Sequence, residues 1–374
     1  MRRRDLLKLT AAGSLLTLTG CGTNKGAAYV DGRLSMAVVT TYGTGTATYA
    51  DMAAVANAVT DVKGLRTRIM TSDTAIGRLA PVRKGQATFS RTGDEYIFAF
   101  RAEYEFAGKD WGPQPTRVVW GPTAPHGLLT RENTGIRELS DIKGKKVPLI
   151  TANPSVNSKI GVALKAAGLT EDDVEMVPIS YGEQADGLKS GKIDFLFQQV
   201  YGSSLFELES STKVRWITFR EDDTALQKAI HELSPSLMLG PFTGAPGQAK
   251  GQSNIGYVYS VPVVAYSTTD AETVSDFVTA ILDAYPKYKD ATRTTRDWSP
   301  EAAVLEPQQV PFHDGLVSVL KERDLWTPAA QKKQDELLAL ESKLTKGWET
   351  VTADLTDDQE IAAAWSRWKD DNDV

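Results

Sequence analysis

Apolar positions along the chain fall into two blocks that repeat the same order of predicted elements. Short apolar or alternating runs predict strands, and segments with apolar residues three and four positions apart predict helices between them. The strands are expected at 34–40, 65–71 and 86–90 in the first block, and at 145–150, 174–179 and 193–198 in the second. Strand, helix, strand is the order of a parallel sheet with crossover helices. The pattern therefore predicts two similar α/β lobes.

Two extended segments link the blocks and divide the chain between the lobes. One, at 120–135, leads out of the first block, and the other, at 254–267, can lead back. The length of 374 residues also favours two domains over one. We expect one lobe from 33–120 plus 262–326, a second lobe from 121–261, and a C-terminal helical extension at 327–374 that packs on the first lobe.

The first 20 residues have the character of an export signal. Three arginines at positions 2–4 precede an apolar run that is too short to span a bilayer, and Leu18–Cys21 resembles a bacterial lipobox. The arginines also resemble a twin-arginine signal. Cys21 is the only cysteine, so we expect its lipidation to anchor the mature chain outside the cytoplasm, in the periplasm or on the outer face of the cell membrane. The alternative is that Cys21 is a buried or incidental thiol. Residues 21–32 are expected to form a tether between the lipid anchor and the folded lobes.

The mature chain is acidic. The full sequence carries a formal charge of −6, and loss of residues 1–20, with four cations and one anion, would make it −9. That charge argues against nucleic acid as a partner, because phosphate binding requires an excess of cations. A lipid on Cys21 would then be the only contact with a membrane.

Residue types expected of a catalytic or metal site are scarce. The three histidines have no ligand partners at useful spacing, and no Cys-x-x-Cys, His-Glu-x-x-His or Gly-x-Ser-x-Gly motif is present. We therefore expect a protein that is not an enzyme, with no cofactor and no transition-metal chemistry. Two carboxylates could still converge in the fold, and Glu183 or Asp186 would be the candidate acids of an enzyme.

The loop YGTGTATY (42–49) connects a predicted strand to an alanine-rich helix. It lacks the Gly-Lys-Ser/Thr of a P-loop and the third glycine of the dinucleotide fingerprint. Its hydroxyls, its backbone N–H groups and the helix N-terminus would still suit an anion, and a carboxylate fits as well as a phosphate. The alternative is that Thr44, Thr46 and Thr48 only cap the helix.

Polar segments follow strands in both lobes, at the positions where α/β sheets place their ligand sites. Arg91, after the third strand, could bind a ligand carboxylate through both prongs of its guanidinium, or pair with Asp94 or Glu95 instead. In the second block, ANPSVNS (152–158) and QQVYG (198–202) also follow strands. Together these segments predict one ligand cleft between the lobes.

Several motifs in this order resemble the TAXI family, the extracytoplasmic binding subunits of one class of TRAP transporters. They are YGTGTATY before the alanine-rich helix, SDIKGKKV (140–147), AAGLTEDDV (166–174), YGEQADGLKSGKIDF (181–195) and VPFHDGLVSVLKERDLW (310–326). The resemblance covers about residues 34–326. It implies a type II periplasmic-binding-protein fold, in which two lobes joined by two crossover strands close on a carboxylate-bearing metabolite.

The resemblance also implies the partner and the ligand-binding residues. A small organic anion would be held between the lobes and delivered to TRAP-type permease subunits in the membrane. Carried over position by position, the ligand-binding residues are Gly43, Thr44, Thr46, Tyr49, Ser90, Arg91, Trp120, Thr123, Asn153, Ser155, Asn157, Ser158, Gln199, Tyr201 and Tyr257.

The chain departs from the family in both loops. Thr46 and Ala47 stand where paired glycines are usual, and ANPSVNS has no glycine where Pro-Gly-Ser-Gly is usual. Side chains at these points would reshape the pocket, so the resemblance does not identify the ligand. Presentation of the ligand to a membrane kinase instead of a permease is an alternative function, and an extracytoplasmic enzyme on the same fold is a third.

Overall fold

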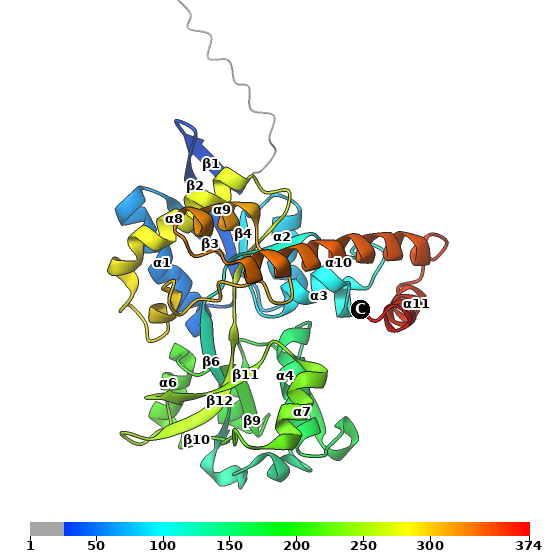
Figure 1. Ribbon diagram of the computed structural model, residues 1–374. Coiled ribbons are helices and arrows are strands. Elements are labelled where there is room, and N and C mark those ends of the chain that lie inside the picture. The colour runs from blue at the N-terminus through cyan, green and yellow to red at the C-terminus, as the bar shows by residue number, and fades with distance from the viewer. Residues whose placement is uncertain (1–25) are drawn as a thin grey trace, which may run out of the picture.

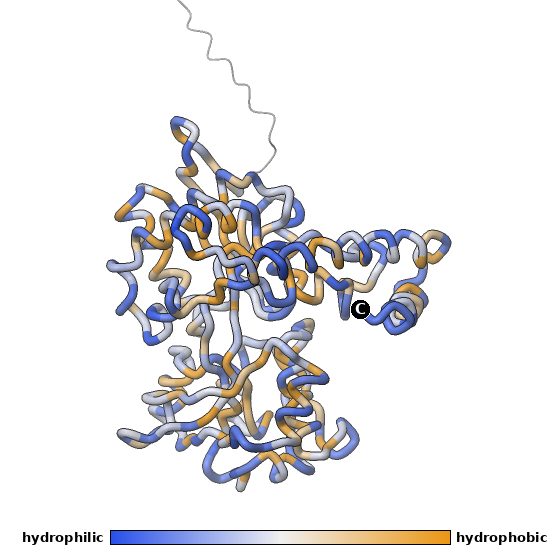
Figure 2. The backbone as a smooth tube through the Cα atoms, in the orientation of Figure 1, coloured by the Kyte–Doolittle hydropathy of each residue, from blue (hydrophilic) through white to orange (hydrophobic). Residues whose placement is uncertain are grey.

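The chain folds into two α/β lobes that lie one above the other and are joined by extended strands (Figure 1). The computed structural model describes residues 26–374, so the predicted export signal and Cys21 lie outside the described residues. Each lobe has its own hydrophobic core, and Figure 2 shows hydrophobic segments gathered inside both. Two separate cores allow the lobes to keep their shape while they move relative to each other.

Lobe 1 is built on a mixed sheet. β2 pairs in parallel with β3 and β4, while β13 returns from lobe 2 and pairs antiparallel with β4 and β5. The strand that leaves for lobe 2 and the strand that returns are therefore neighbours in this sheet. Its strands are β1 (Ala27–Val30), β2 (Arg33–Thr41), β3 (Arg66–Thr71), β4 (Phe89–Arg91), β5 (Thr116–Trp120) and β13 (Val263–Tyr266).

The helices of lobe 1 have clear local signals. In α1, the Thr46 hydroxyl accepts from the backbone N–H of Tyr49, and Gly64 ends the helix with φ of +70°, a conformation that glycine adopts without strain. Met52 and Val55 of α1 are buried in the core. The helices are α1 (Ala47–Lys63), α2 (Ala75–Arg83), α3 (Glu95–Arg101), α8 (Ala271–Tyr288) and α9 (Asp314–Glu322), with 3₁₀ turns η1 (Tyr104–Phe106) and η5 (Thr295–Trp298), followed by the C-terminal α10 (Pro328–Thr352) and α11 (Asp358–Asp371).

Lobe 2 combines an antiparallel sheet with a small parallel one. The order of the larger sheet is β10-β6-β12-β11, with β9 also paired to β6. Its strands are β6 (Thr123–Arg131), β9 (Phe195–Gln199), β10 (Val214–Trp216), β11 (Met238–Thr243) and β12 (Ser253–Ser260), and the smaller sheet holds β7 (Lys146–Ile150) and β8 (Glu175–Ile179). The helices are α4 (Pro154–Ala166), α5 (Gln184–Ser190), α6 (Ser203–Ser211) and α7 (Thr224–Leu233), with 3₁₀ turns η2 (Glu132–Thr134), η3 (Leu139–Ile142) and η4 (Glu171–Asp173).

The strand pairing of lobe 2 differs from the one expected for a parallel sheet. β7 and β8 pair in parallel, but β9 pairs antiparallel with β6, the long strand that arrives from lobe 1. β6 also pairs with β12, the strand that leads back. Hydrogen bonds to a distant strand therefore replace the local pairing that the strand-helix-strand pattern favours.

Two short connections join the lobes. Pro122 separates β5 from β6, and Pro262 separates β12 from β13. The connections run side by side, because the backbone N–H of Val261 donates to the carbonyl of Pro122 at 3.1 Å. Two α/β lobes joined by two crossover strands are the architecture of a type II periplasmic binding protein, so the predicted fold class is confirmed.

The segment predicted as a tether is partly a strand. Ala27–Val30 forms β1, which pairs antiparallel with β2, and Asp31 and Gly32 make the turn between them with φ of +51° and +77°. The tether prediction is therefore wrong for residues 27–32, because β2 offers them an edge to pair with. Its part at 21–25 lies outside the described residues.

The C-terminal helices form a hairpin against lobe 1, with α10 extending sideways from it and α11 folding back (Figure 1). Trp365 is buried in the core of lobe 1, and its indole N–H donates to the carbonyl of Arg101 at 2.9 Å. Lys369 pairs with Glu103 at 2.7 Å. The hairpin therefore supports the segment that follows α3, and this segment borders the space between the lobes.

Candidate functional site

The two lobes touch along a seam of direct polar contacts. At the start of α1, the carbonyl of Gly45 accepts from the backbone N–H of Ser204 at 3.2 Å. The Thr48 hydroxyl donates to Oε1 of Gln199 at 2.8 Å. Both contacts pair lobe 1 with lobe 2, so the structure represents a closed arrangement of the lobes.

The loop before α1 lies at this seam, but its threonines have different roles. Thr46 is buried and makes only local bonds: its hydroxyl accepts from Tyr49 N at 3.1 Å and donates to the Gly43 carbonyl at 2.8 Å. Thr44 is exposed. Thr46 therefore caps the helix, whereas Thr48 reaches across to lobe 2.

Gln199 is the last residue of β9, and Tyr201 lies two positions after it. Gln199 bridges the lobes, because its Oε1 accepts from Thr48 and its Nε2 donates to the Thr294 hydroxyl at 3.2 Å. The Tyr201 hydroxyl instead donates to the Thr243 carbonyl at 2.9 Å, within lobe 2. Gln199 thus makes hydrogen bonds between the lobes, whereas Tyr201 meets lobe 1 through its ring, which lies 5.5 Å from the guanidinium of Arg293.

The start of α4 contributes two predicted residues to the seam. Asn153 caps the helix by accepting from Val156 N, and its amide donates to the Asp73 carbonyl of lobe 1 at 3.1 Å. The Ser155 hydroxyl accepts from the backbone N–H of Asp94 at 2.9 Å. Each residue therefore links α4 to a loop of lobe 1.

Two further predicted residues on α4 point elsewhere. The side-chain amide of Asn157 both accepts from and donates to the backbone of Ile150, at 2.8 Å in each case. The Ser158 hydroxyl donates to the Ser155 carbonyl at 2.9 Å. Asn157 therefore fixes α4 to the end of β7, and neither side chain bonds to lobe 1.

Arg91 is buried inside lobe 1 with acceptors for each of its three nitrogens. Nη1 donates to the Thr48 carbonyl at 2.6 Å, Nη2 to Oδ2 of Asp51 at 3.1 Å, and Nε to the Val261 carbonyl at 3.4 Å. The guanidinium also lies over the ring of Trp298, 4.8 Å from its centroid. Burial lowers the pKa of Arg91, and the charge of Asp51 opposes that shift. In this structure the guanidinium is occupied by the protein and is not presented to a ligand.

Gly43 and Tyr49 meet the Thr46 hydroxyl through their backbones, and the other four predicted residues lie in the cores or at the hinge. Trp120 is buried, and its indole N–H donates to the Trp298 carbonyl at 3.1 Å. Tyr257 and Ser90 are buried, and their hydroxyls have no hydrogen-bond partner among residues 26–374. Thr123 begins β6 at the crossover. Tyr257 belongs to the apolar core of lobe 2, away from the polar contacts described above.

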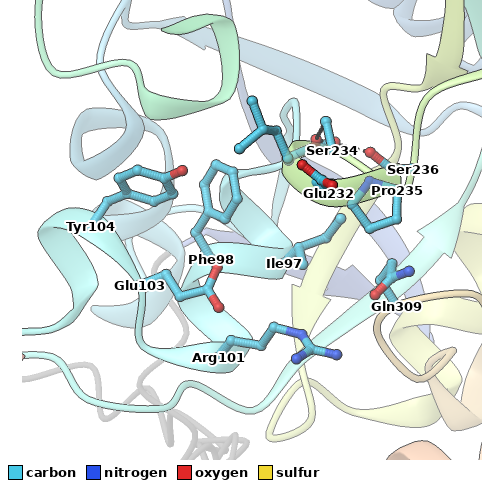
Figure 3. Close-up of a pocket in the computed structure, with 12 residues that line it drawn as sticks. Ile97, Phe98, Arg101, Glu103, Tyr104, Glu232, Ser234, Pro235, Ser236 and Gln309 are labelled. Carbon is cyan, nitrogen blue, oxygen red and sulfur yellow. Dashed lines mark hydrogen bonds between the residues drawn. The ribbon is translucent and has the colours of Figure 1, made fainter. Parts of the chain in front are cut away.

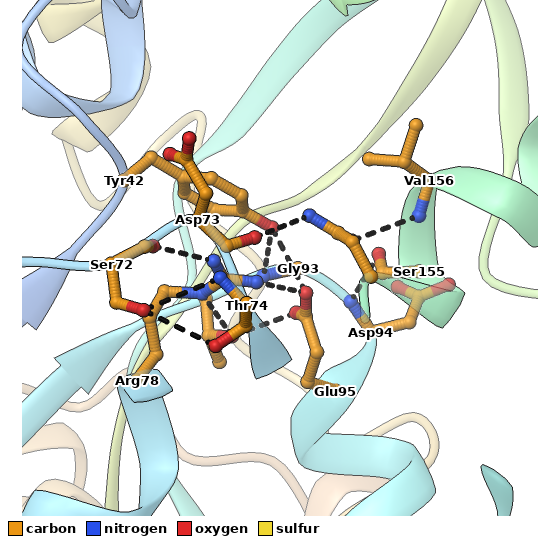
Figure 4. A network of polar contacts seen from close by, with 12 residues as sticks. Tyr42, Ser72, Asp73, Thr74, Arg78, Gly93, Asp94, Glu95, Ser155 and Val156 are labelled. Atoms are coloured by element: carbon orange, nitrogen blue, oxygen red, sulfur yellow. Dashed lines mark hydrogen bonds and ion pairs between the residues drawn. The ribbon is translucent and has the colours of Figure 1, made fainter. Parts of the chain in front are cut away.

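A buried network that the sequence did not predict occupies the centre of the seam (Figure 4). Arg78 on α2 pairs with Glu95 on α3, and both side chains are 0% exposed. The Tyr42 hydroxyl donates to Oε1 of Glu95 at 3.2 Å, and the Thr92 hydroxyl donates to Oε2 at 2.7 Å. The Tyr42 ring lies 5.0 Å from that of Tyr181 in lobe 2. Burial raises the pKa of Tyr42 well above its ordinary value, so the phenol remains a hydrogen-bond donor.

A second ion pair crosses between the lobes. Lys159, on α4 of lobe 2, is 0% exposed and pairs with Asp94 of lobe 1. The same carboxylate oxygen, Oδ2, accepts from the hydroxyls of Ser236 at 2.9 Å and Ser234 at 3.4 Å, which follow α7. The ring of Tyr259 lies 4.8 Å from Nζ of Lys159. Lobe 2 thus directs one cation and two hydroxyls at a single carboxylate oxygen of lobe 1.

The positions of Arg78 and Lys159 in their helices indicate from the sequence that each side chain is buried and paired. Arg78 lies on the same face of α2 as the buried Ala75 and Val82, and Lys159 shares a face of α4 with the buried Ala163. A charged residue in the apolar stripe of a helix must be paired when it is buried. The serines after α7 had no comparable signal, because they belong to no regular element or motif.

His126 on β6 lies beneath the seam as a neutral side chain. Its ring stacks on Tyr259 at 4.3 Å between centroids and on Phe197 at 5.7 Å. Burial lowers the pKa of His126 to about 3. The imidazole therefore adds no charge to the site near neutral pH.

A cavity of about 350 Å³ opens beside the Lys159–Asp94 pair, between α3 of lobe 1 and the end of α7 in lobe 2 (Figure 3). Lobe 1 lines it with Ile97, Phe98 and Tyr104, and lobe 2 with Leu233 and Pro235. A second cavity, of about 610 Å³, lies next to the loop between α8 and η5. Both adjoin residues of the two lobes, so closure of the lobes shapes them.

The two candidate acids of an enzyme lie at the surface of lobe 2. Glu183 and Asp186, the candidate acids of an enzyme, are exposed at the start and in the first turn of α5. Within residues 26–374, no group of three or more His, Cys, Asp or Glu side chains is placed to hold a metal ion. No helix in that range is long and apolar enough to cross a membrane.

Residues 39–323, most of the chain, match the NMT1-like family. The chain belongs to the NMT1-like family. Solved structures with a distant similarity to this NMT1-like chain include MatC from Rhodopseudomonas palustris with bound malate, at 17% identity and a TM-score of 0.48, covering 83% of this chain and 99% of that one. Another is a putative periplasmic sulfonate-binding protein from Methylobacillus flagellatus KT, at 16% identity and a TM-score of 0.41, covering 90% of this chain and 94% of that one. A third is a putative L-cystine ABC transporter from Listeria monocytogenes, at 13% identity and a TM-score of 0.42, covering 71% of this chain and 98% of that one.

Proposed function

We propose that this NMT1-like protein is an extracytoplasmic solute-binding protein that captures a small organic anion, a carboxylate, between its two lobes. It binds without breaking bonds in the ligand and delivers it to a TRAP-type membrane permease. Family membership, the two-lobed fold and the polar seam support the binding role. The motif resemblance to TAXI proteins supports the permease as partner.

The observation that carries the proposal is the position of Lys159. Its side chain is fully buried when the lobes are closed, and the hydroxyls of Ser234 and Ser236 bond to the same oxygen as its ammonium. A buried ammonium is costly unless an anion accompanies it. In an open form, water would solvate Lys159, so closing the lobes requires a negative charge beside it, which Asp94 supplies in this structure and a carboxylate ligand could supply in its place.

Lobe closure would then depend on contacts that exist only in the closed form. A ligand bound to lobe 2 at Lys159 and to lobe 1 through Thr48 or the Tyr42–Glu95 network would shift the equilibrium toward closure. The side-by-side connections at Pro122 and Pro262 are the natural hinge, since they are the only links between the two lobes in the described part of the chain. Of the predicted ligand-binding residues, Asn153, Ser155 and Gln199 support this closed form through contacts between the lobes.

A thermal-unfolding screen tests the binding role. A ligand that binds only the folded protein raises the midpoint in proportion to the logarithm of its concentration. Small carboxylates should raise the midpoint, and the matched primary amides should not. A shift produced equally by acids and amides would contradict recognition of an anion.

The cellular context of the proposal rests on the N-terminus and the motifs. Lipid on Cys21 would tether the protein outside the cytoplasm, where it meets the permease. The alternative partner is a membrane kinase, which would make the protein a sensor. Genes for permease subunits next to this one would favour transport, and a kinase gene there would favour sensing.

A further inference from the structure

The carboxylate of Asp94 occupies lobe 2 in the way that an anionic ligand would. Asp94 belongs to lobe 1, at the start of α3, yet its Oδ2 receives Lys159, Ser234 and Ser236, all from lobe 2. Its other oxygen, Oδ1, is buried and has no hydrogen-bond partner among residues 26–374. The group of lobe 2 donors is therefore organised around one oxygen of a carboxylate that the opposite lobe supplies.

The Asp94 side chain does not cap helix α3, although the residue lies directly before that helix. An aspartate just before a helix commonly accepts from the first N–H groups of that helix. The Asp94 side chain makes no such bond to α3 and turns across the seam instead. Its backbone N–H donates to the hydroxyl oxygen of Ser155 in lobe 2 at 2.9 Å, which holds the residue at the seam independently of its carboxylate.

The cavity of about 350 Å³ borders the same carboxylate. Phe98 and Ile97 on one side face Pro235 on the other (Figure 3), and Glu103, Glu232 and Gln309 add polar groups to the lining. Arg101 lines the same cavity, and no ion pair or hydrogen bond engages its guanidinium within the described part of the chain. A small molecule entering here would meet both apolar and charged side chains and would reach Asp94, which pairs with Lys159.

We propose that Asp94 is an intramolecular substitute for the ligand, and that the ligand is an organic monoanion with an apolar portion. The anionic group of the ligand replaces the Asp94 carboxylate at Lys159, and the apolar portion lies in this cavity. The inference rests on the proposed solute-binding function and names the ligand class and the competitor at that site. The ligand-free protein closes because Asp94 neutralises Lys159. A tethered carboxylate competes at a high effective concentration, so the apparent affinity for the ligand is reduced by the fraction of molecules in which Asp94 occupies the site.

Calorimetric titration with acetate, hexanoate and hexanamide tests this inference on the full-length protein. Asp94→Ala should bind hexanoate at least tenfold more tightly than the wild type, and Asp94→Asn should change affinity in the same direction. Hexanoate should bind at least tenfold more tightly than acetate to Asp94→Ala, because its chain enters the cavity. Hexanamide should not bind, and the double variant Asp94→Ala/Lys159→Met should lose hexanoate.

Asp73→Asn is the matched control for a lost contact between the lobes. Asp73 is another carboxylate of lobe 1 that accepts from lobe 2, from Gly182 N at 2.9 Å, but no cation pairs with it. Its variant should show no tenfold gain for hexanoate. Small-angle scattering adds a second readout, because ligand-free Asp94→Ala should be more open than the wild type and hexanoate should close it.

The outcomes separate this inference from the proposed function. Unchanged or weaker hexanoate binding in both Asp94 variants would overturn the competitor role, and equal affinity for acetate and hexanoate would overturn the place of the apolar portion. If the wild type still binds a carboxylate from the thermal screen, the proposed function survives either failure. If Asp94→Ala gains hexanoate while the wild type shifts with no carboxylate, the Asp94 inference stands and the transport role does not.

Discussion

Arg91 and Asp51 form a buried ion pair within lobe 1, with Nη2 of Arg91 3.1 Å from Oδ2 of Asp51. The hydroxyls of Thr292 and Thr294 donate to the same carboxylate, at 2.5 Å and 2.8 Å to Oδ1. Arg91 also donates to the Val261 carbonyl at the crossover. The pair therefore connects α1, β4, the loop before η5 and the hinge.

Replacing Arg91 should destabilise the fold directly. Arg91→Met leaves Asp51 buried without a cation, and removal of one partner from a buried pair costs about 3–5 kcal/mol. Urea unfolding should show this loss. Arg296→Met, which breaks the exposed pair with Asp290, is the control and should leave the midpoint almost unchanged. Equal midpoints for Arg91→Met and the wild type would contradict a structural role for Arg91.

Lys159→Met should greatly weaken ligand binding, and it should affect the fold less than Arg91→Met does, because the Lys159–Asp94 pair lies between the lobes and opening of the lobes returns Asp94 to water. The methionine keeps much of the side-chain volume but removes the cation, so affinity for a bound carboxylate should fall at least a hundredfold, about 2.7 kcal/mol. Calorimetry with a carboxylate from the thermal screen measures this loss. Lys143→Met is the control in the same lobe, because Lys143 is exposed and pairs with Asp173 away from the cavity. Similar affinities for Lys159→Met and Lys143→Met would remove Lys159 from the binding site.

His126 should make stability fall in acid. Its pKa of about 3 in the folded protein lies below the ordinary value of 6.5, so the folded state favours the neutral ring. The contribution of His126 to the free energy of unfolding is complete above about pH 6.5 and is lost as the pH falls toward 3. The free energy of unfolding then changes by at most about 1.4 kcal/mol per pH unit because of this group. Urea unfolding between pH 3.5 and pH 7, a range chosen at about these limits, should show a flatter profile for His126→Gln. An unchanged profile for His126→Gln, or the same flattening for the exposed His231→Gln, would contradict this assignment.

Local signals account for most of the fold that the sequence predicts. α1 and α4 begin at Thr46 and Asn153, whose side chains cap the helices, and α1 ends at Gly64 in the left-handed conformation. Such signals act over a few residues and are visible in one sequence. The pairing of β9 with β6 was not predictable in this way, because it joins strands more than 60 residues apart with no local mark.

The sequence indicated some residues of the seam but not its buried charges. Ser155 and Gln199 were expected near the cleft because they follow strands, and both contact lobe 1. Arg91 was expected to bind a ligand carboxylate or, as the alternative, to pair with Asp94 or Glu95, whereas it pairs with Asp51, 40 positions earlier on another element. The packing of α2, α3 and α4 decides which buried cation pairs with which carboxylate. That packing cannot be predicted from a single sequence.

Cys21→Ser should release the protein from the membrane of its host. The prediction follows from the lipobox resemblance and concerns a residue outside the described part of the chain. Membrane and soluble fractions probed with an antibody measure it, with the wild type expected in the membrane fraction. Continued membrane association of Cys21→Ser would count against lipidation.

The central claim is that the closed lobes hold an organic anion against Lys159. Native mass spectrometry of wild-type and Lys159→Met protein, purified side by side from the host, tests it most directly. The account predicts one organic acid per wild-type chain, released on unfolding, and a bare Lys159→Met chain. A bare wild-type chain, a neutral or cationic solute, or the same acid on both proteins would contradict it.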